Sequence, residues 1–196
     1  STPNSYLLVN EETGNIEAVG QGDPSIYQQQ LAPENIIDVE NRYIVPGLID
    51  CHVHTMRDGS NSPDTILRTE QPEIIAIRCI RNAQRHLEVG ITTIKDNGSP
   101  GLSAISAKKA FDMGLFVGPF MLAAGAPIIM TGGHFRTGGV EVDGADEARK
   151  EARLHIKNGA SFIKMLASGG INSPKGEEPG SPELTVEEMR AAVEVA

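Results

Sequence analysis

Residues 45–54 read VPGLIDCHVH, a run of mostly apolar residues that ends in two histidines separated by one position. We expect a buried β-strand here. Because successive side chains of a strand point to opposite faces, His52 and His54 project to the same side. Two neighbouring imidazoles at a strand end make half of a metal site, and imidazole suits zinc and similar divalent ions. The spacing alone is a weak signal, since two histidines can also cap a strand by hydrogen bonds.

Strand and helix patterns alternate along the chain after these histidines. Residues 55–71 are polar and form an expected loop. Strands are expected at 91–96, 116–125 and 161–167, and helices at 73–89, 102–113, 145–158 and from Thr185, whose spacing to Glu188 fits a capping box. Helices between strands predict an α/β fold with a parallel sheet. Four such units fit half of a (β/α)8 TIM barrel, whose active sites lie at the carboxyl ends of the strands.

Three local features complete the expected fold. In the helix at 73–89, Ile77, Ile80, Ala83 and Leu87 share one apolar stripe. A long glycine-rich loop is expected at 125–144. Before the barrel, residues 6–20 predict two short strands around a turn at 13–15, and residues 35–47 predict another strand pair with a turn near Glu40 and Asn41.

Composition excludes several classes of function. The net charge of −9, with no cluster of Lys or Arg, argues against a nucleic-acid partner. No apolar run reaches the length needed to cross a membrane. The two cysteines, Cys51 and Cys79, make no disulfide framework, so a reducing cytoplasm is the expected location. Cys51 alternates away from the histidines and is expected to be a small core residue.

Lys164 lies in the apolar strand SFIKMLA, residues 161–167. A lysine that points into a barrel is costly unless its charge is neutralised, and burial lowers its pKa. A neutral amine can react with carbon dioxide to give a carbamate, whose two oxygens suit a bridge between two metal ions. Strand alternation does not decide between this orientation and an outward-facing lysine.

Four stretches together resemble the amidohydrolase superfamily of metal-dependent hydrolases, in its prolidase-like (Xaa-Pro dipeptidase) and carboxypeptidase-like branch. They are VPGLIDCHVHT (45–55), LEVGITTIKDNGSPG (87–101), GPFMLAAGAPIIMTGGH (118–134) and GASFIKMLASGGINSP (159–174). The resemblance implies that residues 1–45 are part of an N-terminal β-sandwich segment and that 46–196 are the first half of the barrel. It also implies that His52, His54 and a carboxylated Lys164 bind two divalent metal ions, with zinc expected.

The same resemblance suggests residues that contact substrate. His134 lies in the loop after the third strand, and Arg136 could form a bidentate pair with a substrate carboxylate. Ser168, Gly169 and Gly170 could line the pocket, although the two glycines also fit a plain turn. Asp96 ends the second strand and either orients a ligand histidine or caps the next turn.

The expected function is hydrolysis of an amide or peptide bond by a metal-activated hydroxide. The substrate is expected to be a small dipeptide or N-acyl amino acid, with Xaa-Pro dipeptides among the candidates. The general-base aspartate is expected in a C-terminal half, so we place no catalytic residue within these 196 and expect them to be inactive alone and to self-associate. Two alternatives remain: a mononuclear cyclic-amide hydrolase similar to imidazolonepropionase, and a non-catalytic piece that acts only in folding or oligomerisation.

Overall fold

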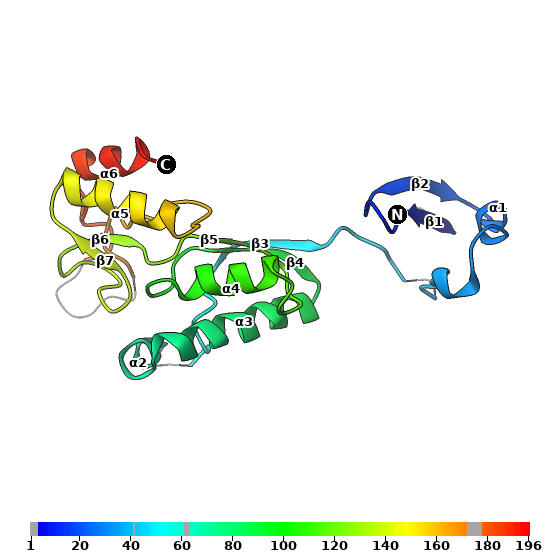
Figure 1. The fold of residues 1–196 in the computed structure, drawn as a ribbon, viewed down its shortest axis with the longest axis horizontal. Helices are drawn as coiled ribbons and strands as arrows, with labels where there is room; N and C mark the ends of the chain where they lie inside the picture. Colours follow the sequence, from blue (N-terminus) through cyan, green and yellow to red (C-terminus); the bar gives the residue numbers. More distant parts are fainter. Residues whose placement is uncertain (1–3, 41, 61–62, 172–177) are drawn as a thin grey trace. The chain divides into compact units, whose positions relative to one another are not determined.

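The computed structural model describes residues 4–40, 42–60, 63–171 and 178–196. The chain divides into two compact units, Ser1–Pro46 and Gly47–Ala196. Strands β1 and β2 and helix α1 lie in the first unit, and the elements from β3 onward lie in the second (Figure 1). None of the helices in the described ranges combines the length and the apolar character that a membrane crossing needs.

The N-terminal unit is built on one β-hairpin. Strands β1 (Ser5–Val9) and β2 (Ile16–Gln21) pair antiparallel, which confirms the strands predicted at 6–20. Helix α1 (Ser25–Gln28) and the short 3-10 helix η1 (Pro33–Asn35) follow. The second strand pair, predicted at 35–47, is wrong for the described residues, and position 41 of its turn lies outside them. Ile37 and Tyr43 are 85% and 82% exposed, so no packing surface favours a strand there.

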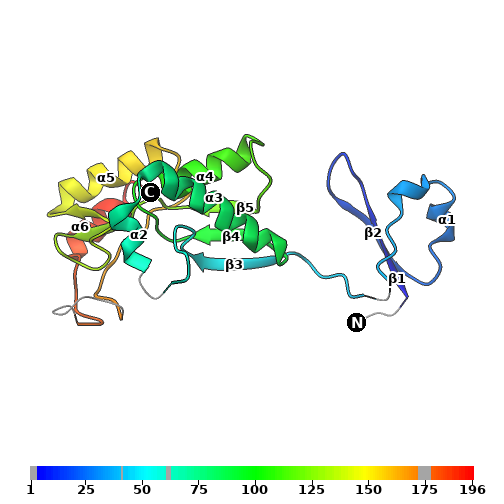
Figure 2. The same cartoon turned by 90° about the horizontal axis from the view of Figure 1, so that it is seen from below.

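The C-terminal unit begins with three parallel strands that are connected through helices. Figure 2 shows β3 (Leu48–Val53), β4 (Ile91–Asp96) and β5 (Phe120–Ala123) side by side, in that order. Helix α3 (Pro72–Glu88) connects the first two strands, and α4 (Ser103–Asp112) connects β4 to β5. A short helix, α2 (Pro63–Thr69), interrupts the loop predicted at 55–71. The predicted parallel α/β fold is therefore confirmed, while the described strands do not close a barrel.

Helix α3 confirms part of the predicted stripe, since Ala83 is buried and Ile80 packs against the core. Its buried residues are Ile75, Cys79 and Ala83, spaced by four, whereas Ile77 is 60% exposed. Both stripes are apolar in sequence, so contacts with α4, Ile94 and the other core residues select which one faces inward. The interpretation of Cys51 as a core residue was also wrong: its side chain is exposed, because β3 is an edge strand of the described sheet.

The last part of the chain forms a second, smaller core. Strands β6 (Ile128–Met130) and β7 (Val140–Val142) pair in parallel within the predicted glycine-rich loop. Helices α5 (Ala145–Lys157) and α6 (Val186–Val193) contribute buried alanines to the same core, and Leu184 joins it just before α6. The Thr185–Glu188 capping box of α6 is confirmed.

The strand predicted at 161–167 does not form as a ladder in the structure. Met165 makes one isolated parallel bridge with Ile128, supported by a 2.9 Å bond from the Ile128 N–H to the Lys164 carbonyl. The Leu166 N–H donates to the Ile128 carbonyl at 3.0 Å. β7 lies on one side of β6, and this segment pairs with Ile128 of β6 through one isolated bridge.

Candidate metal and substrate site

Two histidine rings lie side by side where β3 ends. The centroids of the His52 and His54 rings are 5.4 Å apart, with an edge-on angle of 62°. Asp96 ends the adjacent strand β4, so the carboxyl ends of two parallel strands meet here. Active sites of α/β folds form at this edge of the sheet.

A backbone carbonyl fixes the tautomer of His54. The His54 Nδ1 lies 2.8 Å from the Gly98 carbonyl oxygen. Because a carbonyl oxygen only accepts hydrogen bonds, Nδ1 carries the proton and Nε2 keeps its lone pair. A neutral imidazole with a free Nε2 is the form that binds a metal ion. Gly98 itself has φ of +144°, and its Cα lies against the ring of Pro127.

The carboxylate of Asp96 is fully buried and bonded to the residue that follows His54. One oxygen accepts the backbone N–H of Thr55 at 2.8 Å and its hydroxyl at 2.5 Å. The other accepts the Gly98 N–H at 3.0 Å. Asp96 thus caps the turn, which is one of the two roles that the sequence left open, and its bonds to Thr55 hold the end of the strand.

Lys164 is half-buried, and burial lowers the pKa of its amine. The positive charge of Lys95 acts in the same direction. The Lys95 ammonium itself lies over the ring of Phe162, 4.3 Å from its centroid. Lys95 was missed from sequence, although it alternates with the buried residues Ile94 and Asp96 and must therefore face the opposite side of the sheet.

The pKa of His52 is also lowered. The protein packed around the ring is the main cause, although much of the side chain is exposed, and the neighbouring His54 and Lys164 add to the effect. The charge of Asp50 opposes it. The imidazole is therefore held toward its neutral, metal-binding form.

The loop after β6 brings His134 beside Gly170. A Cβ atom built on Gly170 would lie 2.3 Å from the Cε1 of His134, so the backbone and the ring are in close contact. The His134 N–H donates to both oxygens of Glu183, at 2.8 and 3.0 Å. Sequence reasoning missed Glu183, because no local pattern connects it to a loop 49 residues away.

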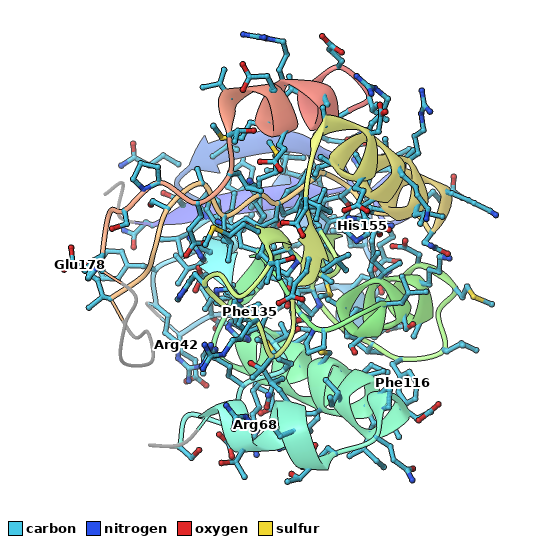
Figure 3. The ribbon with its side chains drawn as sticks, turned by 90° about the vertical axis from the view of Figure 1, so that its left-hand side faces the viewer. Arg42, Arg68, Phe116, Phe135, His155 and Glu178 are labelled. Carbon is cyan, nitrogen blue, oxygen red and sulfur yellow. The ribbon has the colours of Figure 1, made fainter. Side chains whose placement is uncertain are left out.

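Phe135 is a further residue that sequence reasoning missed. Labelled in Figure 3, it has a positive φ of 61°, which is rare for a bulky residue. The centroid of its ring lies 6.5 Å from the centroid of the His54 ring and 5.9 Å from Cζ of Arg57. Strained residues of this kind cluster at binding and active sites.

The other predicted substrate residues lie nearby in sequence but differ in setting. Arg136 and Ser168 are exposed, and Gly169 is buried. The Gly169 N–H donates to the Ser181 carbonyl at 2.9 Å, so this amide is already engaged within the chain. Only His134 and Gly170 are brought into contact by the structure; a role for the other three in substrate binding stays a prediction.

The described residues contain no group of three or more His, Cys, Asp or Glu side chains arranged to hold a metal ion. Among the residues that the structure describes, His52 and His54 supply two nitrogen donors side by side. A carboxylated Lys164 would supply oxygen donors, and its lowered pKa fits that chemistry. The donor set is compatible with a divalent ion that accepts nitrogen and oxygen ligands.

Comparison with known proteins identifies relatives of the chain. Residues 43–196 match the amidohydrolase family. The ochratoxinase of Aspergillus niger is 30% identical over 179 residues, which cover 78% of this chain and 36% of the relative. The structure is similar to that of a prolidase complexed with N-methylphosphonate-L-proline, with 30% identity and a TM-score of 0.75 over 92% of this chain and 46% of the other.

A solved Xaa-Pro dipeptidase with methionine bound in its active site gives a similar result. It is 29% identical, with a TM-score of 0.74, over 92% of this chain and 47% of the dipeptidase. The chain thus spans about half the length of these two solved structures and about a third of the ochratoxinase.

Proposed function

The chain belongs to the amidohydrolase family, and on that premise we propose that its protein hydrolyses the amide bond of a dipeptide or N-acyl amino acid. Xaa-Pro dipeptides are the first substrates to test, since both the prolidase and the Xaa-Pro dipeptidase resemble the chain over 92% of its length. We further propose that residues 46–196 are the first half of a (β/α)8 barrel, that 1–45 are part of a β-sandwich segment, and that the protein is a cytoplasmic homo-oligomer.

His52, His54 and Lys164 would hold two divalent metal ions, with zinc the expected metal. Such a pair activates water as a nucleophile and polarises the scissile carbonyl. His52 would bind through an imidazole whose pKa is lowered mainly by burial. His54 would bind through Nε2, because its Nδ1 is bonded to the Gly98 carbonyl. The single observation that carries the proposal is the bond between His54 Nδ1 and the Gly98 carbonyl, which leaves Nε2 as a donor beside His52.

Lys164 would take part as a carbamate. Its neutral amine attacks the carbon of carbon dioxide, a nitrogen–carbon bond forms, and one proton is released to solvent. The product carries a negative charge on two oxygens in place of a cation. The lowered pKa of Lys164 favours the neutral amine that this reaction requires.

The substrate would lie against the loops that contain His134 and Gly170. The ring of His134 contacts Gly170, and its backbone is anchored by Glu183, so the imidazole is held in one place. Arg136 is exposed and can pair with the substrate carboxylate through two parallel hydrogen bonds. Ser168 and Gly169 would line the same pocket. The general-base aspartate would come from a C-terminal part of the protein.

The test is the metal content per chain of the whole protein, with and without Lys164→Ala. Lys157→Ala is the matched control, because Lys157 is an exposed lysine on α5. Two metal ions that fall to one or none only in Lys164→Ala support the proposal, and hydrolysis of a panel of dipeptides then identifies the substrate. One metal ion, unchanged by the substitution, would instead indicate a mononuclear cyclic-amide hydrolase. No bound metal and no amide hydrolysis would leave a non-catalytic role in folding or oligomerisation.

A further inference from the structure

We propose that Asp96 is a positioning residue for His54, holding the imidazole in the tautomer that leaves Nε2 free for a metal ion. The inference rests on the proposed function in one respect: it takes His54 to be a metal ligand. Asp96 contacts neither the imidazole nor substrate, and it acts through Thr55 and Gly98.

The Asp96 carboxylate is surrounded by hydrogen-bond donors. Its side chain has no exposed surface. Thr55 donates its backbone N–H and its hydroxyl to Oδ2, and Gly98 donates its N–H to Oδ1. The hydroxyl of Ser99 lies 3.1 Å from both oxygens. A buried carboxylate requires this degree of bonding, because an unpaired buried charge is strongly unfavourable.

These bonds act on His54 from both sides. Thr55 follows His54 in the chain, so its two bonds to Asp96 fix the backbone from which the imidazole projects. Gly98, held by the other carboxylate oxygen, supplies the carbonyl that accepts the His54 Nδ1 proton. The carboxylate therefore sets the distance between a histidine and its own hydrogen-bond acceptor. Asn97 adds a third connection, since its N–H donates to the Val53 carbonyl at 2.9 Å.

An aspartate is required here, and an asparagine does not replace it. Both carboxylate oxygens accept, and every group that faces them is an N–H or O–H donor. The amide of asparagine would place an NH2 group against either Thr55 or Gly98, so that two donors face each other. Asp96→Asn changes the shape of the side chain little, and it removes the acceptor for either Thr55 or Gly98.

The first measurement is the imidazole tautomer of His54 in the metal-free protein, read by ¹⁵N NMR. The wild type is expected to hold the proton on Nδ1. In Asp96→Asn the Nε2-protonated form should appear, and the dissociation constant for Zn²⁺, measured by chelator competition, should rise about 10- to 100-fold, the usual effect of losing an outer-shell partner.

The matched control is Glu188→Gln. Glu188 is also a buried, hydrogen-bonded carboxylate, which accepts from the Thr185 N–H at the start of α6 and from the Gly144 N–H at the start of α5. This substitution removes comparable bonds from the second core and should leave the His54 tautomer and the Zn²⁺ affinity unchanged. An effect equal to that of Asp96→Asn would show that general loosening of the fold, and not positioning, causes the change.

A second pair of variants keeps the test valid if Asp96→Asn does not fold. Thr55→Val removes the hydroxyl that donates to Asp96 and keeps the backbone donor, and Thr55→Ser restores the hydroxyl. Thr55→Val should shift the tautomer and weaken Zn²⁺ binding, and Thr55→Ser should behave as wild type. A His54 tautomer and a Zn²⁺ affinity within about twofold of wild type in both Asp96→Asn and Thr55→Val would overturn the proposal. A tautomer shift in a protein that binds no Zn²⁺ would support the positioning role and refute the metal-site function.

Discussion

Gly98→Ala should destabilise the C-terminal unit more than any other single methyl group added in the loop after β4. Gly98 has φ of +144°, a backbone conformation that side-chain-bearing residues rarely adopt. The added Cβ would also lie 2.5 Å from Cγ of Pro127, which is fully buried. Neither atom can move away freely, because Cγ belongs to the buried ring of Pro127 and the new Cβ is bonded directly to the backbone.

The magnitude follows from these two terms. Backbone strain of this kind costs about 1–3 kcal/mol, and overpacking a buried site costs about 1–3 kcal/mol more. The expected loss is therefore about 2–6 kcal/mol, a large part of the roughly 5–15 kcal/mol that stabilises a typical domain. Gly101→Ala is the matched control from the same loop. Gly101 has φ of +53° and no atom within 4 Å of an added Cβ, so only the backbone cost of about 1–2 kcal/mol applies.

The assay is urea unfolding followed by circular dichroism, with all variants measured under identical conditions. The denaturation midpoint of Gly98→Ala should fall clearly below that of Gly101→Ala, and both should fall below that of wild type. Equal midpoints for the two variants would refute the close packing of Gly98 against Pro127, and with it the placement of the carbonyl that holds His54.

Three further outcomes follow from the structure. Burial lowers the pKa of His155, so the unfolded chain binds more protons than the folded one. The free energy of unfolding should therefore be full above pH about 6.5 and decline below it. The drop in urea midpoint from pH 7.5 to 5.5 should be smaller in His155→Gln, and an unchanged drop would contradict this. Burial raises the pKa of Cys79 to about 12, so a thiol reagent should modify the exposed Cys51 quickly and Cys79 only on unfolding; two fast thiols would disprove the packing of α3. Glu188→Gln should lower the free energy of unfolding by about 1–2 kcal/mol, because its NH2 group would face one of the two backbone N–H groups, of Thr185 and Gly144, that donate to the carboxylate. A stability equal to wild type would contradict this bonding.

Local patterns predicted the elements that local forces determine. The capping box at Thr185 lies where the sequence placed it, because it depends on residues within one turn. The His52 and His54 rings lie together for the same reason, since strand alternation alone puts them on one side.

Features that depend on distant partners were harder to predict. Strands β6 and β7 are three residues each and pair across a loop rich in glycine, so their periodicity is too short to detect. In α3 the prediction placed Ile77 in the core where the structure has Ile75, because the two residues are equally apolar and only contact with the sheet distinguishes them. Phe135 and Glu183 reach the candidate site through loop conformations that no pattern in the sequence describes.

The hydrogen bonds at the end of β3 also have a consequence for how the chain folds. They join Thr55 to Asp96, His54 to Gly98 and Cys51 to Asn97, which are 41, 44 and 46 positions apart, with helix α3 between them. Closing such a loop costs conformational entropy before any of these bonds can stabilise the chain. Contacts of this range therefore form later than the helix that they enclose. His54 should therefore acquire its fixed tautomer only after α3 has docked on β4. During synthesis, the pair of histidines leaves the ribosome well before residues 96–98, and a chain at that stage displays two imidazoles on an untethered strand.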